Sequence, residues 1–279
     1  MIWLPLAALF EFGFAQLFKS SQRRGHYAPV VVPANYLMLS SVLTAYLLIT
    51  GQFAFSPQVL KVGMVTGAVF IFAMTIMTRA LQRANVGAVF TAFRIAVVVP
   101  VAASVAIWGE TVSAAQITGV AFALGALVLM TFRPGETGGG WGLKTLGVIM
   151  PVFCCQGVSH TCLRWVHYAG LDGQLTQVLC VIGGTAGILG ALWVVLKGYR
   201  PRAGETMMGL GIGLYNMTAL LVILTTLSKV PGTVFFPVLG CAVVILDNLA
   251  AHFYWKEHLS RPAVVGVVLA VCAIILVVN

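Results

Sequence analysis

Long apolar runs separated by short polar connectors constrain this chain more than any other feature. A helix crosses the hydrocarbon of a bilayer in about 20 residues. Only 8% of the 279 residues are charged, whereas a soluble domain carries roughly 25%. We therefore predict an all-α integral membrane protein with ten transmembrane helices. Cutting the chain at glycines, prolines and charge clusters places these spans at 2–18, 29–50, 61–81, 86–108, 114–132, 144–165, 174–196, 206–227, 232–255 and 262–278.

The two halves of the chain match weakly at an offset of 146–147 residues. The matches are "WGETVS" at 108–113 with "WKEHLS" at 255–260, "ALQR" at 80–83 with "TLSK" at 226–229, Gly119 with Gly266, Pro5 with Pro151, and Gly63 and Gly67 with Gly209 and Gly213. Each half holds five spans, and an odd number inverts the second half in the membrane. We predict a first five-helix repeat at 1–133, a Gly-rich linker at 134–143 and an inverted second repeat at 144–279.

The basic residues lie mainly in the connectors, and one face carries most of them. Connectors that alternate along the chain hold twelve Lys and Arg on one face, and the other face holds Lys61, Arg164 and Lys229. The positive-inside rule makes the basic face cytoplasmic and puts both termini outside, in a cell (inner) membrane. Because the net charge of +9 is spread over these connectors, we predict the lipid bilayer, and no nucleic acid, as its partner.

The ends of spans 4 and 9 carry a more specific pattern. "PVAASVAIWGETVSAAQITGVAFALGALVLM", from residue 100, resembles the signature of the drug/metabolite transporter superfamily, EamA-like ten-span type, and "AAHFYWKEHLSRPAVVGVVLAVCAIILVV" is a weaker second copy. The resemblance covers essentially the whole chain. It implies two inverted five-helix repeats around a central cavity, lined mainly by spans 1, 3, 4, 6, 8 and 9.

Three ionisable side chains interrupt the apolar spans at a similar depth. Glu11 precedes Lys19 by eight residues, or about 12 Å of helix, and Asp247 and Arg94 reach the same level from the same face. Half of the hydrocarbon thickness is about 15 Å, and carriers built from repeats bind substrate near the midplane. The predicted substrate-binding residues at this level are Glu11, Arg94, Gln156, Tyr215, Asn216, Asp247 and Asn248.

Structural and functional interpretations of these charges both remain open. Glu11, Arg94 and Asp247 could form ion pairs that only neutralise one another. If Arg94 is free, it can hold a carboxylate or phosphate in bidentate geometry, and a free Glu11 or Asp247 can hold a cation or a proton. His160 is a packing residue or a proton relay. The candidates for proton coupling are thus Glu11, Asp247 and His160.

Other residues have mainly structural interpretations. Glu110 and Glu257 lie at the turn into the next span, with Ser113 and Ser260 following, and are typical of helix starts. The Gly-x-x-x-Gly pairs allow close helix contact. Prolines such as Pro100 could kink the spans. The six cysteines all lie in apolar runs, and we expect free thiols.

The chain carries no nucleotide-binding, zinc-binding or redox motif. We therefore expect neither a cofactor nor a bound metal, and no enzyme activity. The prediction is a secondary active transporter of a small polar metabolite, amino-acid-like or an organic anion, working by alternating access with proton coupling or exchange. One alternative is a broad exporter of cationic or aromatic compounds; alternatives of another class are a membrane-embedded enzyme or a channel. The protein is expected to be a monomer or homodimer.

Overall fold

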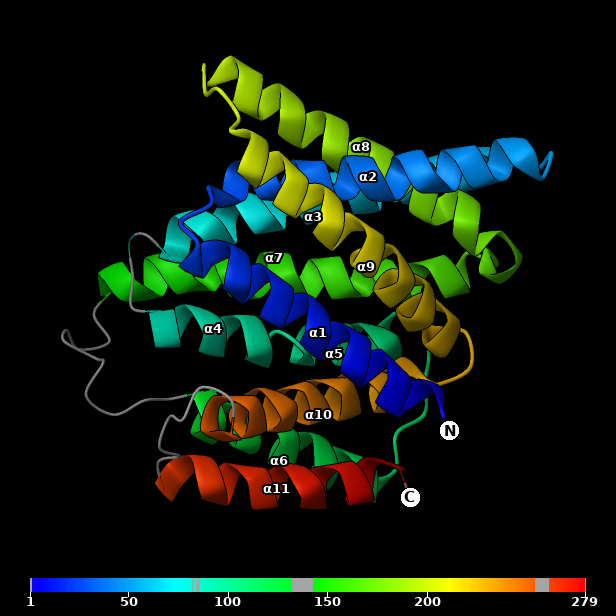
Figure 1. Cartoon of the computed structure of the whole chain (residues 1–279). Helices are drawn as coiled ribbons and strands as arrows, with labels where there is room; N and C mark the ends of the chain where they lie inside the picture. The colour runs from blue at the N-terminus through cyan, green and yellow to red at the C-terminus, as the bar shows by residue number, and fades with distance from the viewer. Residues whose placement is uncertain (1, 82, 84–85, 132–142, 254–260, 279) are drawn as a thin grey trace. The chain divides into compact units, whose positions relative to one another are not determined.

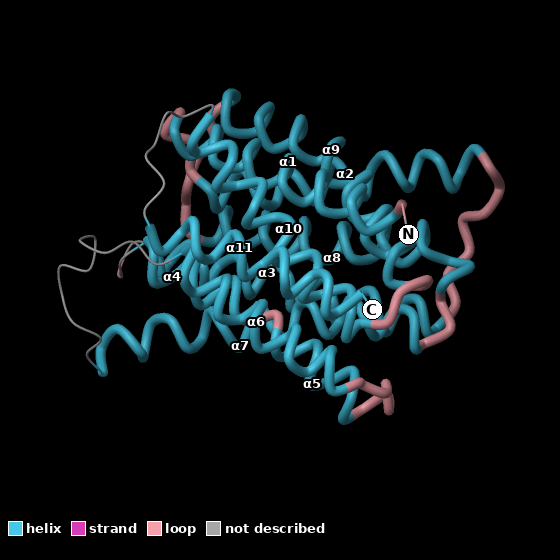
Figure 2. The backbone as a smooth tube through the Cα atoms, turned by 90° about the horizontal axis from the view of Figure 1, so that it is seen from below, coloured by secondary structure: helices cyan, strands magenta, loops and turns pink. Residues whose placement is uncertain are grey.

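The computed structural model describes residues 2–81, 83, 86–131, 143–253 and 261–278. Within these residues the chain is helical with short loops and contains no strand (Figure 2). The predicted linker at 134–143 lies outside the described residues except for Leu143. The helices (Figure 1) are α1 Trp3–Arg23, α2 Ala28–Ile49, α3 Pro57–Leu81, α4 Val86–Ile95, α5 Val98–Ala106, α6 Ala114–Thr131, α7 Leu143–Tyr168, the 3-10 helix η1 Asp172–Gln174, α8 Leu175–Leu196, α9 Ala203–Leu227, α10 Gly232–Phe253 and α11 Arg261–Val278.

Eight helical segments of the described chain are long and apolar enough to cross a membrane. They are Ala28–Ile49, Pro57–Leu81, Val89–Ala106, Leu146–Tyr168, Asp172–Leu196, Ala203–Leu227, Gly232–Ala250 and Arg261–Val278. The all-α class and a multi-pass arrangement thus agree with prediction. The predicted span 2–18 coincides with α1, which carries Glu11 and Lys19 and is not among the eight. The predicted span 114–132 coincides with α6, whose apolar part Ala114–Met130 is shorter than the eight. A total of ten spans stays a prediction.

The predicted span 86–108 is interrupted where α4 ends and α5 begins. Pro100 has no N–H to donate to the carbonyl of Ala96, and its ring disfavours a regular helix at that carbonyl. The amide of Val99 donates to this carbonyl instead, at 3.0 Å, in the tighter pattern of a 3-10 turn. The proline therefore explains why one apolar run forms two short helices.

The chain folds into two compact units. Unit 1 comprises residues 1–12, 79–161 and 229–279, and unit 2 comprises residues 13–78 and 162–228. Each unit draws helices from both halves of the sequence, so the compact units differ from the predicted ranges 1–133 and 144–279. The predicted repeat is a correspondence between residues of the first half and residues of the second half. The division into units does not test it, and it stays a prediction.

Unit 2 is built on the packing of α2 against α8, which cross closely in Figure 1. A Cβ on Gly183 would lie 2.7 Å from Leu39 Cδ2, and one on Gly187 would lie 2.8 Å from Leu37 Cγ. Small residues at such positions let helix backbones approach closely in a membrane, where packing takes over from the hydrophobic effect. Leu39 is fully buried as a result.

The two Gly-x-x-x-Gly pairs extend this packing within unit 2. A Cβ on Gly63 of α3 would lie 2.7 Å from Val181 Cβ of α8, and Gly67 approaches Ile182 and Thr185 on the same helix. In α9, a Cβ on Gly209 would lie 2.6 Å from Ala34 Cβ of α2, and Gly213 approaches Asn35 and Met38. The prediction that these pairs permit close helix contact is confirmed.

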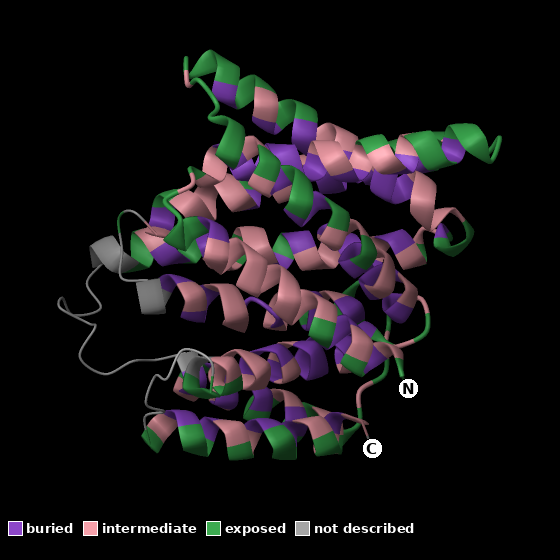
Figure 3. Cartoon of the chain, in the orientation of Figure 1, coloured by how far each residue is buried: buried purple, intermediate pink, exposed green. Residues whose placement is uncertain are grey.

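Unit 1 contains an equivalent tight pair, α6 and α11. A Cβ on Gly119 would lie 2.6 Å from Val277 Cγ2, and one on Gly266 would lie 2.6 Å from Met130 Cγ. Burial along α11 alternates with the helical period (Figure 3). Its buried face is mostly small, and its exposed face bears Val264, Val265, Val268, Val271 and Ile275. An exposed face of this composition suits contact with lipid.

Candidate functional site

An ion pair inside the apolar part of unit 1 joins α4 to α10. Arg94 Nη2 donates to Asp247 Oδ2 at 2.8 Å. The two side chains are 14% and 28% exposed, respectively. Arg94 is therefore engaged by an acid of the chain itself, which is the structural arrangement that the sequence left open.

The position of Arg94 follows from the break between α4 and α5. Arg94 lies in the last turn of α4, where the aligned peptide dipoles give the helix end a partial negative charge. Its guanidinium also lies 5.7 Å from the centre of the Phe93 ring. The helix end and the ring therefore favour a cation at this position even without an acidic partner. The carboxylate of Asp247 from α10 adds a full negative charge.

Glu11 of α1 belongs to the same cluster. The half-buried Glu11 carboxyl lies within electrostatic range of both Arg94 and Asp247. The structure thus brings together the three ionisable residues that depth alone placed at one level. We call Glu11, Arg94 and Asp247 the charge cluster. With both acids ionised it carries one more negative than positive charge.

Gln156 and His160 form a pair on α7, one helical turn apart. Gln156 Nε2 lies 2.8 Å from His160 Nε2, and the His160 ring stacks on Phe236 of α10 at 5.5 Å between ring centres. Arg94 is within electrostatic range of the imidazole. Within the described residues His160 Nδ1 is buried without a hydrogen-bond partner. Such a group costs about 1–3 kcal/mol unless something else satisfies it, so a ligand is one physical reason for its presence.

The other predicted site residues have contacts elsewhere. Asn248 Nδ2 donates to the carbonyl of Val244 in its own helix, at 2.9 Å. Tyr215 and Asn216 belong to unit 2. Tyr215 lies so close to Gly13 that a Cβ there would clash with its ring, and Asn216 Nδ2 donates to Asn35 Oδ1 at 3.1 Å. Asn35 is not among the predicted site residues, although a lone amide in an apolar run is a signal that could have indicated it.

Arg164 lies at the end of the predicted span 144–165, and the charge count assigned it to the sparse face. It lies inside α7, is only 3% exposed, and donates through Nη1 to the carbonyl of Leu227 at the end of α9. Its guanidinium also lies 4.8 Å from the centre of the Tyr168 ring. Arg164 therefore ties the end of α7 to the end of α9 and is not an exposed connector charge.

Glu110 begins a helix, though not the one that follows it. Its carboxylate accepts hydrogen bonds from the backbone amides of Gly232 and Thr233, at 3.1 and 3.0 Å, and from Thr233 Oγ1 at 3.0 Å. It thereby caps α10, the helix that carries Asp247. The start of α6 is capped by Ser113, which exchanges hydrogen bonds with Gln116. The corresponding Glu257 and Ser260 lie outside the described residues.

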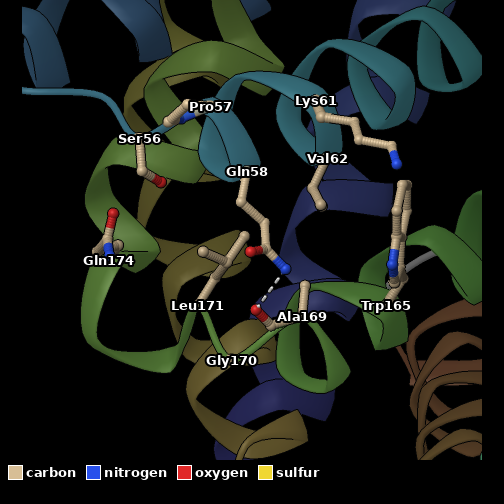
Figure 4. A pocket seen from close by; sticks show the side chains of 10 residues that line it. All are labelled: Ser56, Pro57, Gln58, Lys61, Val62, Trp165, Ala169, Gly170, Leu171 and Gln174. Atoms are coloured by element: carbon tan, nitrogen blue, oxygen red, sulfur yellow. Dashed lines mark hydrogen bonds between the residues drawn. The ribbon is translucent and has the colours of Figure 1, made fainter.

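A pocket of about 780 Å³ lies at one end of unit 2, between the start of α3 and the turn from α7 to α8 (Figure 4). Gln58 Nε2 donates to the carbonyl of Ala169 across it, at 3.0 Å, and Figure 4 shows Lys61 and Trp165 side by side on one wall. Lys61 is the one ionisable side chain of its lining. The pocket was not predicted, because it arises where two loops meet.

The remaining chemistry of the described residues is limited. They contain no group of three His, Cys, Asp or Glu side chains arranged to hold a metal ion. The six cysteines are free thiols, as expected.

Comparisons with known proteins bear on the fold. No family model matches the chain. An uncharacterized protein of Haemophilus influenzae is 23% identical to it over 221 residues, which is 78% of this chain and 74% of that protein. A solved crystal structure superposes with a TM-score of 0.81 at 16% sequence identity, over 98% of this chain and 94% of the other. The chain therefore shares its helical fold with a protein of known structure.

Proposed function

We propose that the protein is a secondary active transporter of the drug/metabolite transporter superfamily, EamA-like type, that binds a small polar metabolite at the charge cluster. The observation that carries the proposal is the Arg94–Asp247 ion pair at 2.8 Å, which joins two helical segments apolar enough to span a membrane, with Glu11 of α1 in electrostatic range. Ionisable groups at such positions are costly and usually serve a polar pathway or substrate.

The helix contacts support the inverted repeat. The partners of Gly63 and Gly67 on α8 are Val181, Ile182 and Thr185, and the partners of Gly209 and Gly213 on α2 are Ala34, Asn35 and Met38. Each residue of the first set lies 147 positions after its counterpart in the second. A two-fold relation that exchanges the halves produces such reciprocal contacts.

Unit 1 supports the same relation independently. Gly119 approaches Val277 and Leu276, and Gly266 approaches Met130 and Leu129. These partners are again 147 residues apart. The borders between the units fall after residues 12 and 161, and after residues 78 and 228, at nearly equivalent points of the two halves.

The charges favour an amino-acid-like substrate. A ligand carboxylate displaces Asp247 from Arg94 and takes its hydrogen bond, and the released Asp247 together with Glu11 holds the ligand's ammonium group. The exchange keeps both cations paired with acids and leaves the same single acid in excess as before, whereas an anion without an ammonium group would leave both acids without a cation. A gradient of the substrate supplies the energy when transport works by exchange. A proton gradient supplies it when transport is coupled to protons through Glu11, Asp247 or His160.

A second candidate is an exporter of cationic or aromatic compounds. It is favoured by the pairing of Arg94 with Asp247, because the cluster then has one acid in excess for a cation. In this case Arg94 stays paired throughout transport, and Glu11 is the residue that binds the ligand.

A thermal-shift screen separates the two candidates. Purified protein is tested with zwitterionic, purely anionic and purely cationic metabolites of matched size. The proposal predicts stabilisation by zwitterions that disappears in Arg94→Gln. Stabilisation by amines alone, unchanged in Arg94→Gln and lost in Glu11→Gln, favours the second candidate. Absence of stabilisation in all three classes contradicts both.

A further inference from the structure

Two connectors of unit 2 that are far apart in sequence are fastened together at one end of the unit. The connector after α1 contains Tyr27, and the connector from α8 to α9 contains Tyr199, and the two rings lie 4.7 Å apart between centres. The amide of Tyr27 donates to Glu205 Oε1 at 3.2 Å, and Tyr199 Oη donates to the same oxygen at 2.9 Å. The amide of Arg202 donates to Glu205 Oε2 at 3.0 Å.

Both helices that lead into these connectors end in the same way. α1 and α8 are followed by Gly25 and Gly198, at φ 72° and 65°. The amides of the next residues, His26 and Tyr199, reach back to Ser21 and Val194 in the Schellman pattern. Glycine is required because it adopts positive φ without strain. The chain therefore turns sharply after each helix, and the two connectors are in contact through the rings of Tyr27 and Tyr199.

This junction gathers positive charge. Its exposed basic side chains, here called the basic cluster, are Arg23, Arg24, Lys197, Arg200 and Arg202. Residues 13–78 and 162–228 contain two acids, Asp172 and Glu205. Asp172 lies beyond the other end of α8 and pairs with His167 at 2.7 Å. Glu205 is 2% exposed and its carboxylate is occupied by three donors. The acid nearest to the basic cluster is thus directed inward.

Apolar surface lies directly beside the basic cluster. Leu192, Val195 and Leu196 are exposed on the last turns of α8, just before Lys197. The Lys197 ammonium lies 5.0 Å from the centre of the Trp193 ring, and Tyr27 is exposed. Trp and Tyr at the ends of apolar helices are typical of the level of lipid headgroups. A ligand that suits this surface has a negatively charged head and apolar tails.

We propose that the basic cluster is a binding site for an anionic phospholipid, with the phosphate held by Arg24, Lys197 and Arg200 and the acyl chains against the end of α8. Clusters of four to eight basic residues beside a membrane helix bind anionic lipids, at about 1 kcal/mol for each Lys or Arg. A soluble phosphate compound would satisfy the charges but would leave the apolar strip without a partner. The site is independent of the proposed transport function.

The test compares lipids with the full chain in detergent. The protein is titrated with short-chain phosphatidylglycerol, short-chain phosphatidylcholine or glycerol 3-phosphate, and bound ligand is counted by native mass spectrometry. We expect binding of phosphatidylglycerol in preference to both others. Equal binding of the two lipids overturns the proposal, as does glycerol 3-phosphate binding as tightly as phosphatidylglycerol, which would point to a site for soluble phosphates.

Substitutions locate the site. Arg200→Gln should weaken binding of phosphatidylglycerol about fivefold, and the triple variant Arg24→Gln, Lys197→Gln, Arg200→Gln about a hundredfold. Lys61→Gln removes one charge at the opposite end of unit 2 and is the matched control, with unchanged affinity. None of these side chains contributes the hydrogen bonds to Glu205, so unfolding temperatures in phosphatidylcholine nanodiscs should agree with the wild type. Wild-type affinity in the triple variant, or an equal loss in Lys61→Gln, contradicts the assignment.

Discussion

Arg94 of α4 and Asp247 of α10 are 153 residues apart in sequence and form a hydrogen-bonded ion pair at 2.8 Å. A pair in such surroundings is costly to break by removing one partner, because the other charge is left without compensation. Since both side chains are partly exposed, we expect Asp247→Asn to lower the free energy of unfolding by about 1–3 kcal/mol. Thermal unfolding of both single variants and of the double variant Arg94→Gln, Asp247→Asn measures the coupling. If the loss of stability in the double variant equals the sum of the losses in the two single variants, the pair contributes nothing.

Glu11 should behave differently from this pair. We expect Glu11→Gln to fold with an unfolding temperature close to that of the wild type, because the amide keeps the size of the carboxyl and Asp247 still holds Arg94. Where Glu11, and not Asp247 or His160, exchanges the proton, transport by this variant should lose its dependence on pH. Proteoliposomes with an imposed pH gradient provide the measurement. Asp247→Asn is the companion variant, and it is expected to reduce transport as well.

Glycines of α9 provide a matched test of the helix contacts. A Cβ on Gly213 would lie 2.5 Å from the carbonyl oxygen of Asn35 and 2.8 Å from Met38 Cβ, whereas nothing lies within 4 Å of one on Gly211. Gly213→Ala should therefore destabilise by about 1–3 kcal/mol through overpacking. Gly211→Ala should be neutral or slightly stabilising, because Ala is the better helix former. The repeat predicts that Gly67→Ala loses a similar amount of stability. If Gly67→Ala were as stable as Gly211→Ala, that result would count against the repeat.

The junction of the two connectors predicts a dependence on alkaline pH. Burial, and then the hydrogen bond to Glu205, raise the pKa of Tyr199 above its usual value of 10. Since the folded state holds this proton more tightly, the contribution of Tyr199 to stability is complete below pH 10 and is lost as the pH rises through the raised pKa. Tyr199→Phe should unfold at a temperature that falls less between pH 9 and 11, a range of about one unit on each side of the ordinary tyrosine pKa. Parallel curves for the two proteins would exclude this role.

Orientation can be tested by labelling. The charge bias predicts that residue 22 faces the cytoplasm and that the loop before α3 faces outward. Gln22 and Gln58 are exposed, whereas Val62 is buried and unsuitable. In a variant without the six natural cysteines, an impermeant maleimide applied to intact cells should label Gln58→Cys and leave Gln22→Cys unlabelled. The reverse pattern would invert the topology.

Much of the fold follows from composition and period. Apolar runs of about 20 residues predict the helices, and every predicted span overlaps a helix of the structure. The break at Ala96 and Val97 could have been anticipated from Pro100, since proline removes the hydrogen bond four residues back. The membership of the two units could not, because it depends on which helices meet in space.

The charge cluster was predicted by depth, which needs only the rise per residue. Depth says nothing of direction around the helix axis, so Asn248 was included although its amide serves Val244. Arg164 lies at the end of the predicted span 144–165, where hydropathy alone does not tell a buried helix end from an exposed connector. Its partner, the carbonyl of Leu227, is a backbone group that no sequence pattern indicates.

The central claim is that the charge cluster carries substrate, and counterflow in proteoliposomes tests it most directly. Vesicles preloaded with the metabolite that stabilises the purified protein are diluted into the same labelled compound, and uptake is compared for the wild type, Arg94→Gln and Glu11→Gln. We predict saturable uptake by the wild type and loss of this uptake in Arg94→Gln. The unfolding temperature of each variant is measured in parallel, so that loss of the fold is not mistaken for loss of transport. Uptake by both variants at the wild-type rate would contradict the account.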